Sequence, residues 1–185
     1  MRPRGTRYVG VDVRESALRA APPGSFDEVW TLDICDERIA KLGPFDLAVS
    51  WQALEHVRPL AVALENVRQS LRPGGKFVAL LSGRYALFSI ANRLLPTRFG
   101  VSFMQHLLRR PPDTVFKAFY DACSASALWR LLETWSQANV TPLYRGAEYL
   151  TFAPRLQRFY VRYESWAREG AHANLATHYL VEAVR

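Results

Sequence analysis

The segment from residue 45 to residue 81 constrains the fold most, because it contains a strand, a helix and a second strand in succession. Residues 45–51 (FDLAVSW) and 76–81 (KFVALL) are short apolar runs, typical of buried strands. Residues 58–71 repeat leucine and valine at helical spacing, and the RPGG that follows ends the helix. Two apolar strands joined through a helix are typical of a mostly parallel sheet, so the segment predicts an α/β fold.

The rest of the chain alternates in the same way. Apolar runs and breaker residues predict further strands at 7–13, 28–32, 140–144 and 178–184, and helices at 15–21, 84–95, 124–138 and 154–168. No internal repeat, low-complexity tract or interdomain linker interrupts this pattern. We therefore expect one domain over residues 1–185.

Composition and charge narrow the function classes without selecting one. The net charge is +7, and the second half (84–185) holds 13 Lys and Arg against 7 Asp and Glu. This excess can face nucleic acid, anionic lipid or an acidic substrate, or it can be a solvated surface. The two cysteines, Cys35 and Cys123, suffice neither for a disulfide framework nor for a four-ligand zinc site, so we expect buried thiols and no metal. The chain has neither a run of 18 apolar residues nor a signal peptide pattern, which predicts a cytoplasmic protein.

Polar residues stand where the predicted strands end. They are Asp12, Asp33, Ser50 and Ser82. In doubly wound sheets ligands bind outside the carboxyl ends of the strands. The carboxylate of Asp12 could accept two hydrogen bonds from a ribose diol, and Asp33 could accept from an exocyclic amine beside the amide of Ile34 or Cys35. Each acid could instead cap a helix or form a turn.

Four stretches together resemble class I, Rossmann-like S-adenosylmethionine-dependent methyltransferases. They are YVGVDVRESAL at 8–18, LDICDE at 32–37, FDLAVSW…EHV…LRPGGKF at 45–77 and HYLVEAVR at 178–185. Their order and spacing are more specific than any one of them, and the resemblance covers about residues 7–83 and 124–185. It implies a mostly parallel sheet flanked by helices, with an antiparallel last strand.

The resemblance also implies a cofactor and its ligands. The cofactor would be S-adenosylmethionine, with Asp12 and the neighbouring Val13 at the ribose and Asp33 with Ile34 at the adenine. Ser50 and Trp51 would line the pocket beside the methionine part. The acceptor would be a small or lipid-like molecule, placed by segments 84–123 and 148–174 as lid or acceptor-side insertions.

The sequence departs from the family pattern at its beginning. No strand and no GxGxG precede Arg7, whereas the family's first strand lies between its second and fourth strands and leads into a glycine-rich loop. Without this strand, the second and fourth strands would lose their backbone hydrogen-bond partners, at a cost of about 1–3 kcal/mol for each unpaired buried group, unless they paired directly with each other. We expect a truncated chain, with two alternatives: a different strand pairing or a strand borrowed from a partner. Cofactor binding would then be impaired.

Several residues and segments allow more than one functional interpretation. His56 could act as a general base, or it could cap and pack against the following helix. Segment 84–110 mixes apolar residues with arginines and could be a lid, a peripheral membrane contact or a core helix. The aromatic residues of 154–168 recur at helical spacing and predict a buried stripe, so we expect no nucleic-acid partner. Alternative functions are a non-catalytic remnant or interaction module of the same fold and, less favoured, a nicotinamide-dependent oxidoreductase.

Overall fold

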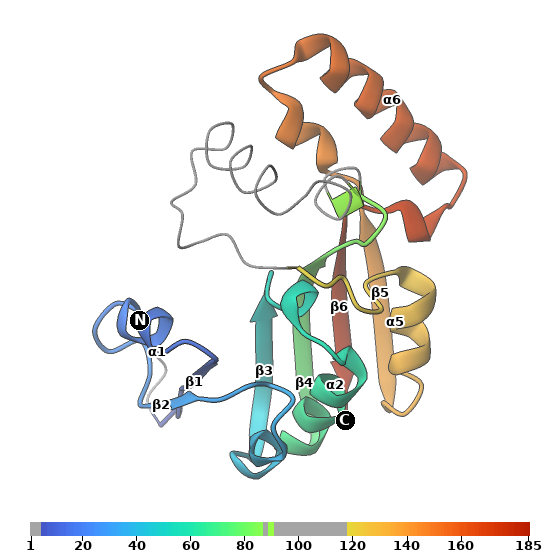
Figure 1. Cartoon of the computed structure of the whole chain (residues 1–185). Helices are drawn as coiled ribbons and strands as arrows, with labels where there is room; N and C mark the ends of the chain where they lie inside the picture. The colour runs from blue at the N-terminus through green and yellow to red at the C-terminus, as the bar shows by residue number, and fades with distance from the viewer. Residues whose placement is uncertain (1–4, 87–88, 91–117) are drawn as a thin grey trace.

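The computed structural model describes residues 5–86, 89–90 and 118–185, and its strands form two separate sheets (Figure 1). The larger sheet has the order β3-β4-β6-β5 and the smaller one pairs β1 with β2. The strand bounds are β1 Val9–Asp12, β2 Glu28–Thr31, β3 Phe45–Trp51, β4 Leu71–Ser82, β5 Gln137–Leu143 and β6 His178–Val184.

Strand directions confirm the predicted α/β class. β1 runs parallel to β2, and β3 runs parallel to β4 through the connecting helix α2 (Leu60–Ser70). The last strand, β6, is antiparallel to both β4 and β5, as the resemblance implied. The shorter elements are α1 Glu15–Arg19, η1 Glu37–Lys41, η2 Leu54–His56, α5 Ala125–Leu131, η4 Gly146–Leu150 and η5 Ala173–Leu175.

The sheet is divided where the family's first strand would stand. Among the described strands, β1 pairs with β2 alone and β3 pairs with β4 alone. Strands β1 and β3, which would flank that missing strand, therefore do not pair with each other. All of β2 and most of β3 are exposed, so water can reach the backbone groups that lack a strand partner.

One face of the larger sheet holds the core. Helices α2 and α5 lie in front of this sheet in Figure 1. The side chains of β4 and β6 that point to this face are buried in one cluster, namely Phe77, Ala79, Leu81, Tyr179, Val181 and Ala183. The ring of Phe77 stacks at a tilt on that of Trp135, with centroids 5.7 Å apart. Alternate positions along each strand thus supply a continuous apolar layer.

The opposite face is uncovered at β3. Leu47, Val49 and Trp51 alternate with the residues that face the core, and all are exposed; Val49 is 64% exposed. The resemblance implied helices on both faces, and the described residues provide a covered face on one side only. This strand therefore presents apolar side chains to water.

Some element boundaries differ from the prediction. Helix α5 ends at Leu131 rather than at residue 138, because Gln137 already pairs with Val184 in the β5–β6 ladder. Strand β4 begins at Leu71, directly after α2, and its pairing with β3 carries a register shift near Phe45. Most of the predicted helix 84–95 and of the predicted lid or acceptor-side segment 84–123 lies outside the described residues.

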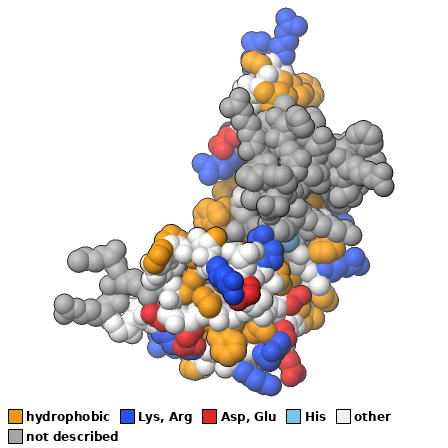
Figure 2. Space-filling view, turned by 60° about the vertical axis from the view of Figure 1, so that its left-hand side comes forward, with side chains coloured by type: hydrophobic (Ala, Val, Ile, Leu, Met, Phe, Trp, Pro, Cys, Tyr) orange, Lys and Arg blue, Asp and Glu red, His pale blue; other side chains and the backbone are white. Residues whose placement is uncertain are grey.

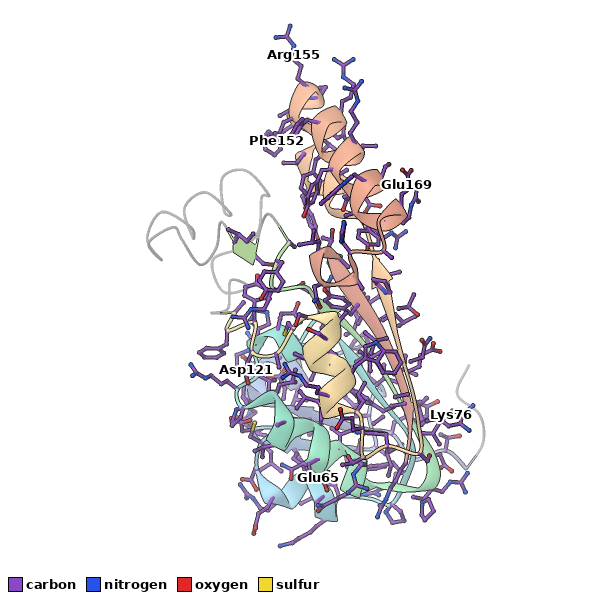
Figure 3. The ribbon with its side chains drawn as sticks, turned by 90° about the vertical axis from the view of Figure 1, so that its right-hand side faces the viewer. Glu65, Lys76, Asp121, Phe152, Arg155 and Glu169 are labelled. Atoms are coloured by element: carbon purple, nitrogen blue, oxygen red, sulfur yellow. The ribbon has the colours of Figure 1, made fainter. Side chains whose placement is uncertain are left out.

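Helix α6 (Pro154–Glu169) projects from the end of the larger sheet, as Figures 1 and 3 show. Its predicted range is confirmed, but its predicted buried aromatic stripe is wrong in part. Tyr160 is buried and Tyr163 half-buried, whereas Phe159 and Trp166 are 69% and 54% exposed. In the described part of the chain, no helix has the length and apolar character needed to cross a bilayer.

Candidate functional site

Asp12 ends β1 and shapes the turn that follows. Its Oδ1 accepts a hydrogen bond from the backbone N–H of Arg14 at 2.8 Å, and the Arg14 Nε lies 3.8 Å from the same oxygen. The side chain is partly exposed, and within the described residues its Oδ2 accepts no hydrogen bond. Asp12 is thus a turn former that still offers one carboxylate oxygen to a ligand.

Asp33 repeats this arrangement after β2. Its Oδ1 accepts from the N–H of Cys35 at 2.8 Å, which removes that amide from the two predicted candidates. The N–H of Ile34 has no acceptor among the described residues, while the Ile34 carbonyl accepts from the Asn66 side chain at 3.1 Å. Asn66 also donates to the Asp36 carbonyl at 3.1 Å, so α2 holds this loop in place.

The structure brings the two acids to one edge of the smaller sheet. The parallel register pairs Asp12 with Thr31, and the N–H of Leu32 donates to the Asp12 carbonyl at 3.1 Å. Asp33 follows directly, so the two carboxylates leave adjacent strand ends. Val13, also predicted at the ribose, lies beside Asp12 and is exposed.

Ser50 and Trp51 stand on the other sheet. They end β3, where they pair with Ala79 and Leu80 of β4. Trp51 is exposed on the uncovered face. The predicted ligands of the nucleoside and of the methionine part therefore belong to different sheets.

A buried carboxylate that the sequence analysis did not single out lies beside the end of β4. Glu55 in η2 is only 4% exposed, and its Oε1 accepts from the Ser82 hydroxyl at 2.8 Å. Among the described residues, its Oε2 has no hydrogen-bond partner. The Glu55 carbonyl accepts from the N–H groups of Phe119 and Tyr120 at 2.9 and 3.0 Å. Glu55 thus joins η2, β4 and the segment that begins at residue 118.

His56, the predicted weak catalytic candidate, adjoins this group. It ends η2, is half-buried, and its backbone N–H donates to the Ala53 carbonyl at 3.0 Å. Nothing in this geometry assigns its ring to catalysis. Its catalytic role remains a prediction.

A buried histidine, His178, begins β6. The Nε2 of His178 lies 3.2 Å from the hydroxyl of Tyr149 in η4. Burial, and then the charge of Arg145, lowers the pKa of His178. The imidazole is therefore held in its neutral form at neutral pH.

The prediction of two buried thiols is confirmed for Cys123, whereas Cys35 is only half-buried. Burial raises the pKa of the Cys123 thiol to about 12 and that of Cys35 to about 11. Such thiols stay protonated and unreactive at neutral pH. Among the described residues, no three potential metal ligands cluster together.

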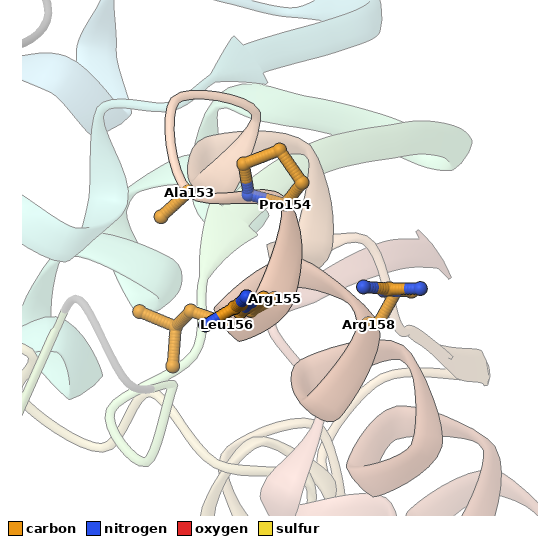
Figure 4. Close-up of a pocket in the computed structure, with 5 residues that line it drawn as sticks. All are labelled: Ala153, Pro154, Arg155, Leu156 and Arg158. Atoms are coloured by element: carbon orange, nitrogen blue, oxygen red, sulfur yellow. The ribbon is translucent and has the colours of Figure 1, made fainter.

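A shallow, mostly apolar hollow lies at the start of α6, away from the strand ends (Figure 4). Its lining residues are Ala153, Pro154, Arg155, Leu156 and Arg158. None of the predicted cofactor ligands contributes to it.

Known methyltransferases resemble this chain in part of its sequence and in its fold. Residues 1–77 match the family described as a methyltransferase domain. The chain resembles class I methyltransferases in sequence and fold. It is also 37% identical over 82 residues to the polyketide methyltransferase ustM of Ustilaginoidea virens. That match covers 40% of this chain and 19% of the relative, so the chain spans about a fifth of the relative's length.

Solved structures share the methyltransferase fold at low sequence identity. A SAM-dependent methyltransferase from Archaeoglobus fulgidus aligns with a TM-score of 0.55 and 16% identity, covering 96% of this chain and 75% of that one. The plantazolicin methyltransferase BamL, solved with a triazolic desmethylPZN analog and SAH, gives 0.55 and 9%, covering 97% and 68%. The N-methyltransferase NodS from Bradyrhizobium japonicum WM9, solved with S-adenosyl-l-homocysteine, gives 0.50 and 15%, covering 97% and 66%.

The described residues fit the nucleoside half of S-adenosylmethionine. Asp12 and Asp33 each keep one carboxylate oxygen for a hydroxyl or amine, and Ile34 keeps a backbone donor for a ring nitrogen. For the methionine half, the described candidates are Ser50 and Trp51 at the end of β3. The fit is therefore good at one end of the cofactor and sparse at the other.

Proposed function

We propose that the chain binds S-adenosylmethionine and transfers its methyl group to a small or lipid-like acceptor. The observation that carries the proposal is the pair of carboxylates at the adjacent ends of β1 and β2. Each uses one oxygen to fix its own turn, which holds the other oxygen in a set direction. A nucleoside needs such acceptors for its ribose hydroxyls and its exocyclic amine.

Each ligand residue has a defined task in this proposal. Asp12 binds the ribose hydroxyls beside Val13, Asp33 accepts from the adenine amine, and the Ile34 N–H donates to a ring nitrogen. Ser50 and Trp51 border the methionine part. The bound cofactor supplies a methyl group on a sulfonium, and the protein holds the acceptor nucleophile in line with it.

The acceptor side is assigned to segments 84–123 and 148–174. The second segment contains α6 and the end of η4, and α6 lies at the end of the larger sheet where β4 ends. The polyketide methyltransferase relative supports a small organic acceptor. Alignment alone can accelerate methyl transfer, so His56 as a general base is an addition to the proposal and not a requirement.

One observation favours a second candidate, a non-catalytic module of the same fold. The predicted cofactor ligands are divided between two sheets that share no strand pairing in the described residues. A site split in this way binds its ligand more weakly than a continuous one, because binding must also order the two parts. The nicotinamide-dependent alternative explains neither Asp33 nor the LRPGGKF segment.

Isothermal titration with S-adenosylhomocysteine tests the proposal. We expect binding by the chain, and a loss of about tenfold to 100-fold in affinity for Asp12→Asn, since a hydrogen bond to a charged group contributes about 1.5–3 kcal/mol. Asp46→Asn is the matched control, because Asp46 is an exposed acid on β3 that pairs with Arg72 at 2.7 Å. Its affinity should equal that of the unmodified chain.

Two results would contradict these assignments. Absence of heat at high micromolar ligand, from a sample whose circular dichroism shows it folded, would reject the cofactor and favour the non-catalytic module. Binding that Asp12→Asn and Asp46→Asn leave equally unchanged would keep the cofactor but remove Asp12 from the ribose.

A further inference from the structure

Helix α6 carries a buried stripe and an exposed apolar stripe, and the buried stripe attaches the helix to the protein. This stripe contains Tyr160, Glu164 and Ala167, all buried. The carboxylate of Glu164 accepts from the Gly146 N–H at 2.6 Å and from the Thr177 hydroxyl at 2.7 Å. These contacts fix α6 to η4 and to the residue before β6.

The second stripe faces outward. It consists of Phe152, Leu156, Phe159 and Trp166, each exposed, with the half-buried Tyr163 between the last two. Their spacing of three, four and seven residues places them on one side of a helix and its preceding turn. The Tyr163 and Trp166 rings lie 5.9 Å apart, so the aromatic surface is continuous there. A contiguous exposed apolar patch marks an interaction site.

A row of arginines borders this outward stripe. Arg155, Arg158 and Arg162 follow one another at helical spacing, and no described residue forms an ion pair with them. Arg38 and Arg68, in the first half, each contact an acid at 2.7 Å. The first turn of α6 holds Arg155 and no acid, which opposes the helix dipole. Stabilisation of the helix therefore does not explain why these arginines lie near its N-terminus.

The position of α6 makes the outward stripe and the arginine row accessible to a partner. The helix projects from the body of the protein, with Phe152 and Arg155 at its outer end in Figure 3. Figure 2 shows hydrophobic and basic side chains together at this end of the molecule. The apolar hollow of Figure 4 lies beside Arg155 and Arg158, so apolar and basic groups meet there as well.

We propose that α6 docks on an anionic lipid surface. The outward stripe would enter the boundary between headgroups and acyl chains, and the arginine row would face the lipid phosphates. The choice of lipid rests on charge complementarity: aromatic side chains, bordered by arginines that form no ion pair with a described residue, match an apolar layer beneath a layer of phosphates. At 16 residues, or about 24 Å, α6 is long enough to lie along such a surface.

Co-sedimentation of the full chain with vesicles tests this proposal. We expect binding to vesicles of phosphatidylglycerol and phosphatidylcholine, and at least tenfold weaker binding to phosphatidylcholine alone. Arg158→Gln should weaken binding to the anionic vesicles about fivefold, and added salt should weaken it further. Phe159→Ser should weaken it at least as much, since it removes an aromatic ring from the stripe.

The controls are on α5, whose residues Trp129 and Arg130 are also exposed. Trp129→Ser and Arg130→Gln make comparable changes in aromatic content and charge, and both should bind vesicles like the unmodified chain. Circular dichroism should show all four variants folded, because each replaced side chain is exposed. Equal binding to both vesicle types, or α5 and α6 variants with equal effects, would overturn the proposal. So would self-association in the absence of lipid that Phe159→Ser abolishes, since the stripe would then be a protein interface.

Discussion

Replacing one valine on each face of the larger sheet tests whether this sheet is covered on one side only. Val181 on β6 is 2% exposed and lies in the core cluster, whereas Val49 on β3 is 64% exposed on the uncovered face. Both are valines in strands, so the change to alanine removes the same side-chain atoms at the two positions. The difference between the two variants therefore reports burial.

The expected magnitudes follow from the exposed fractions. Val181→Ala removes two buried carbon groups, about 1.6 kcal/mol of transfer free energy, and the cavity raises the loss to about 2–3 kcal/mol. Val49→Ala removes the same groups from a site about one-third buried, so it should cost about 0.5 kcal/mol. With a urea slope of about 2 kcal/mol/M, the unfolding midpoint should fall by about 1–1.5 M for Val181→Ala and by about 0.25 M for Val49→Ala.

Urea unfolding followed by circular dichroism measures both variants. The slope should be the same in the two variants, because neither change alters the surface exposed on unfolding by much. Losses of stability that agree within about 0.5 kcal/mol would refute the reasoning, since Val49 would then be packed as tightly as Val181.

Two further predictions concern buried polar groups. Glu55→Ala should lower the free energy of unfolding by about 1–3 kcal/mol, because it leaves the Ser82 hydroxyl without its acceptor. Glu55→Gln keeps an acceptor for this hydroxyl and should lower the free energy of unfolding by less. Thermal unfolding of the two variants measures the difference, and equal losses of stability would contradict this role of Glu55. The lowered pKa of His178 means that the unfolded chain binds its proton first, so stability should be full above pH about 6.5 and fall as the pH drops below it. Urea unfolding at pH 7 and pH 5 should show a smaller decrease for His178→Gln, and an unchanged decrease would show that His178 is not its source.

Local periodicity made most of the fold predictable. The strand, helix and strand of residues 45–81 appear as β3, α2 and β4 because their apolar pattern alone specifies them. The end of α5 was not predictable, since Gln137 leaves the helical pattern to pair with Val184, far along the chain. The end of α5 was set by long-range strand pairing, which the periodicity of a short stretch of sequence cannot show.

The residues at the strand ends of the candidate site could be predicted from the sequence, whereas its buried carboxylate could not. Asp12 and Asp33 follow apolar runs, and this order alone marked them. The buried Glu55 accepts a hydrogen bond from Ser82, 27 residues later, and nothing near Glu55 in the sequence indicates this contact. On α6, both stripes have apolar residues at helical spacing, so the pattern could not show that Phe159 points outward.

The division of the sheet determines how the two parts of the site are held. The smaller sheet contacts the rest of the molecule through side chains: Asn66 binds the carbonyl groups of Ile34 and Asp36, and the Arg7 guanidinium lies 5.6 Å from the centre of the Phe45 ring. Asp33 is therefore fixed to α2 through its own loop, whereas Asp12 is fixed through its pairing with β2. A ligand that bound Asp12 and Ser50 together would connect the two sheets directly. Cofactor binding should consequently order β1 relative to β3, and the free energy spent on that ordering would appear as weaker affinity.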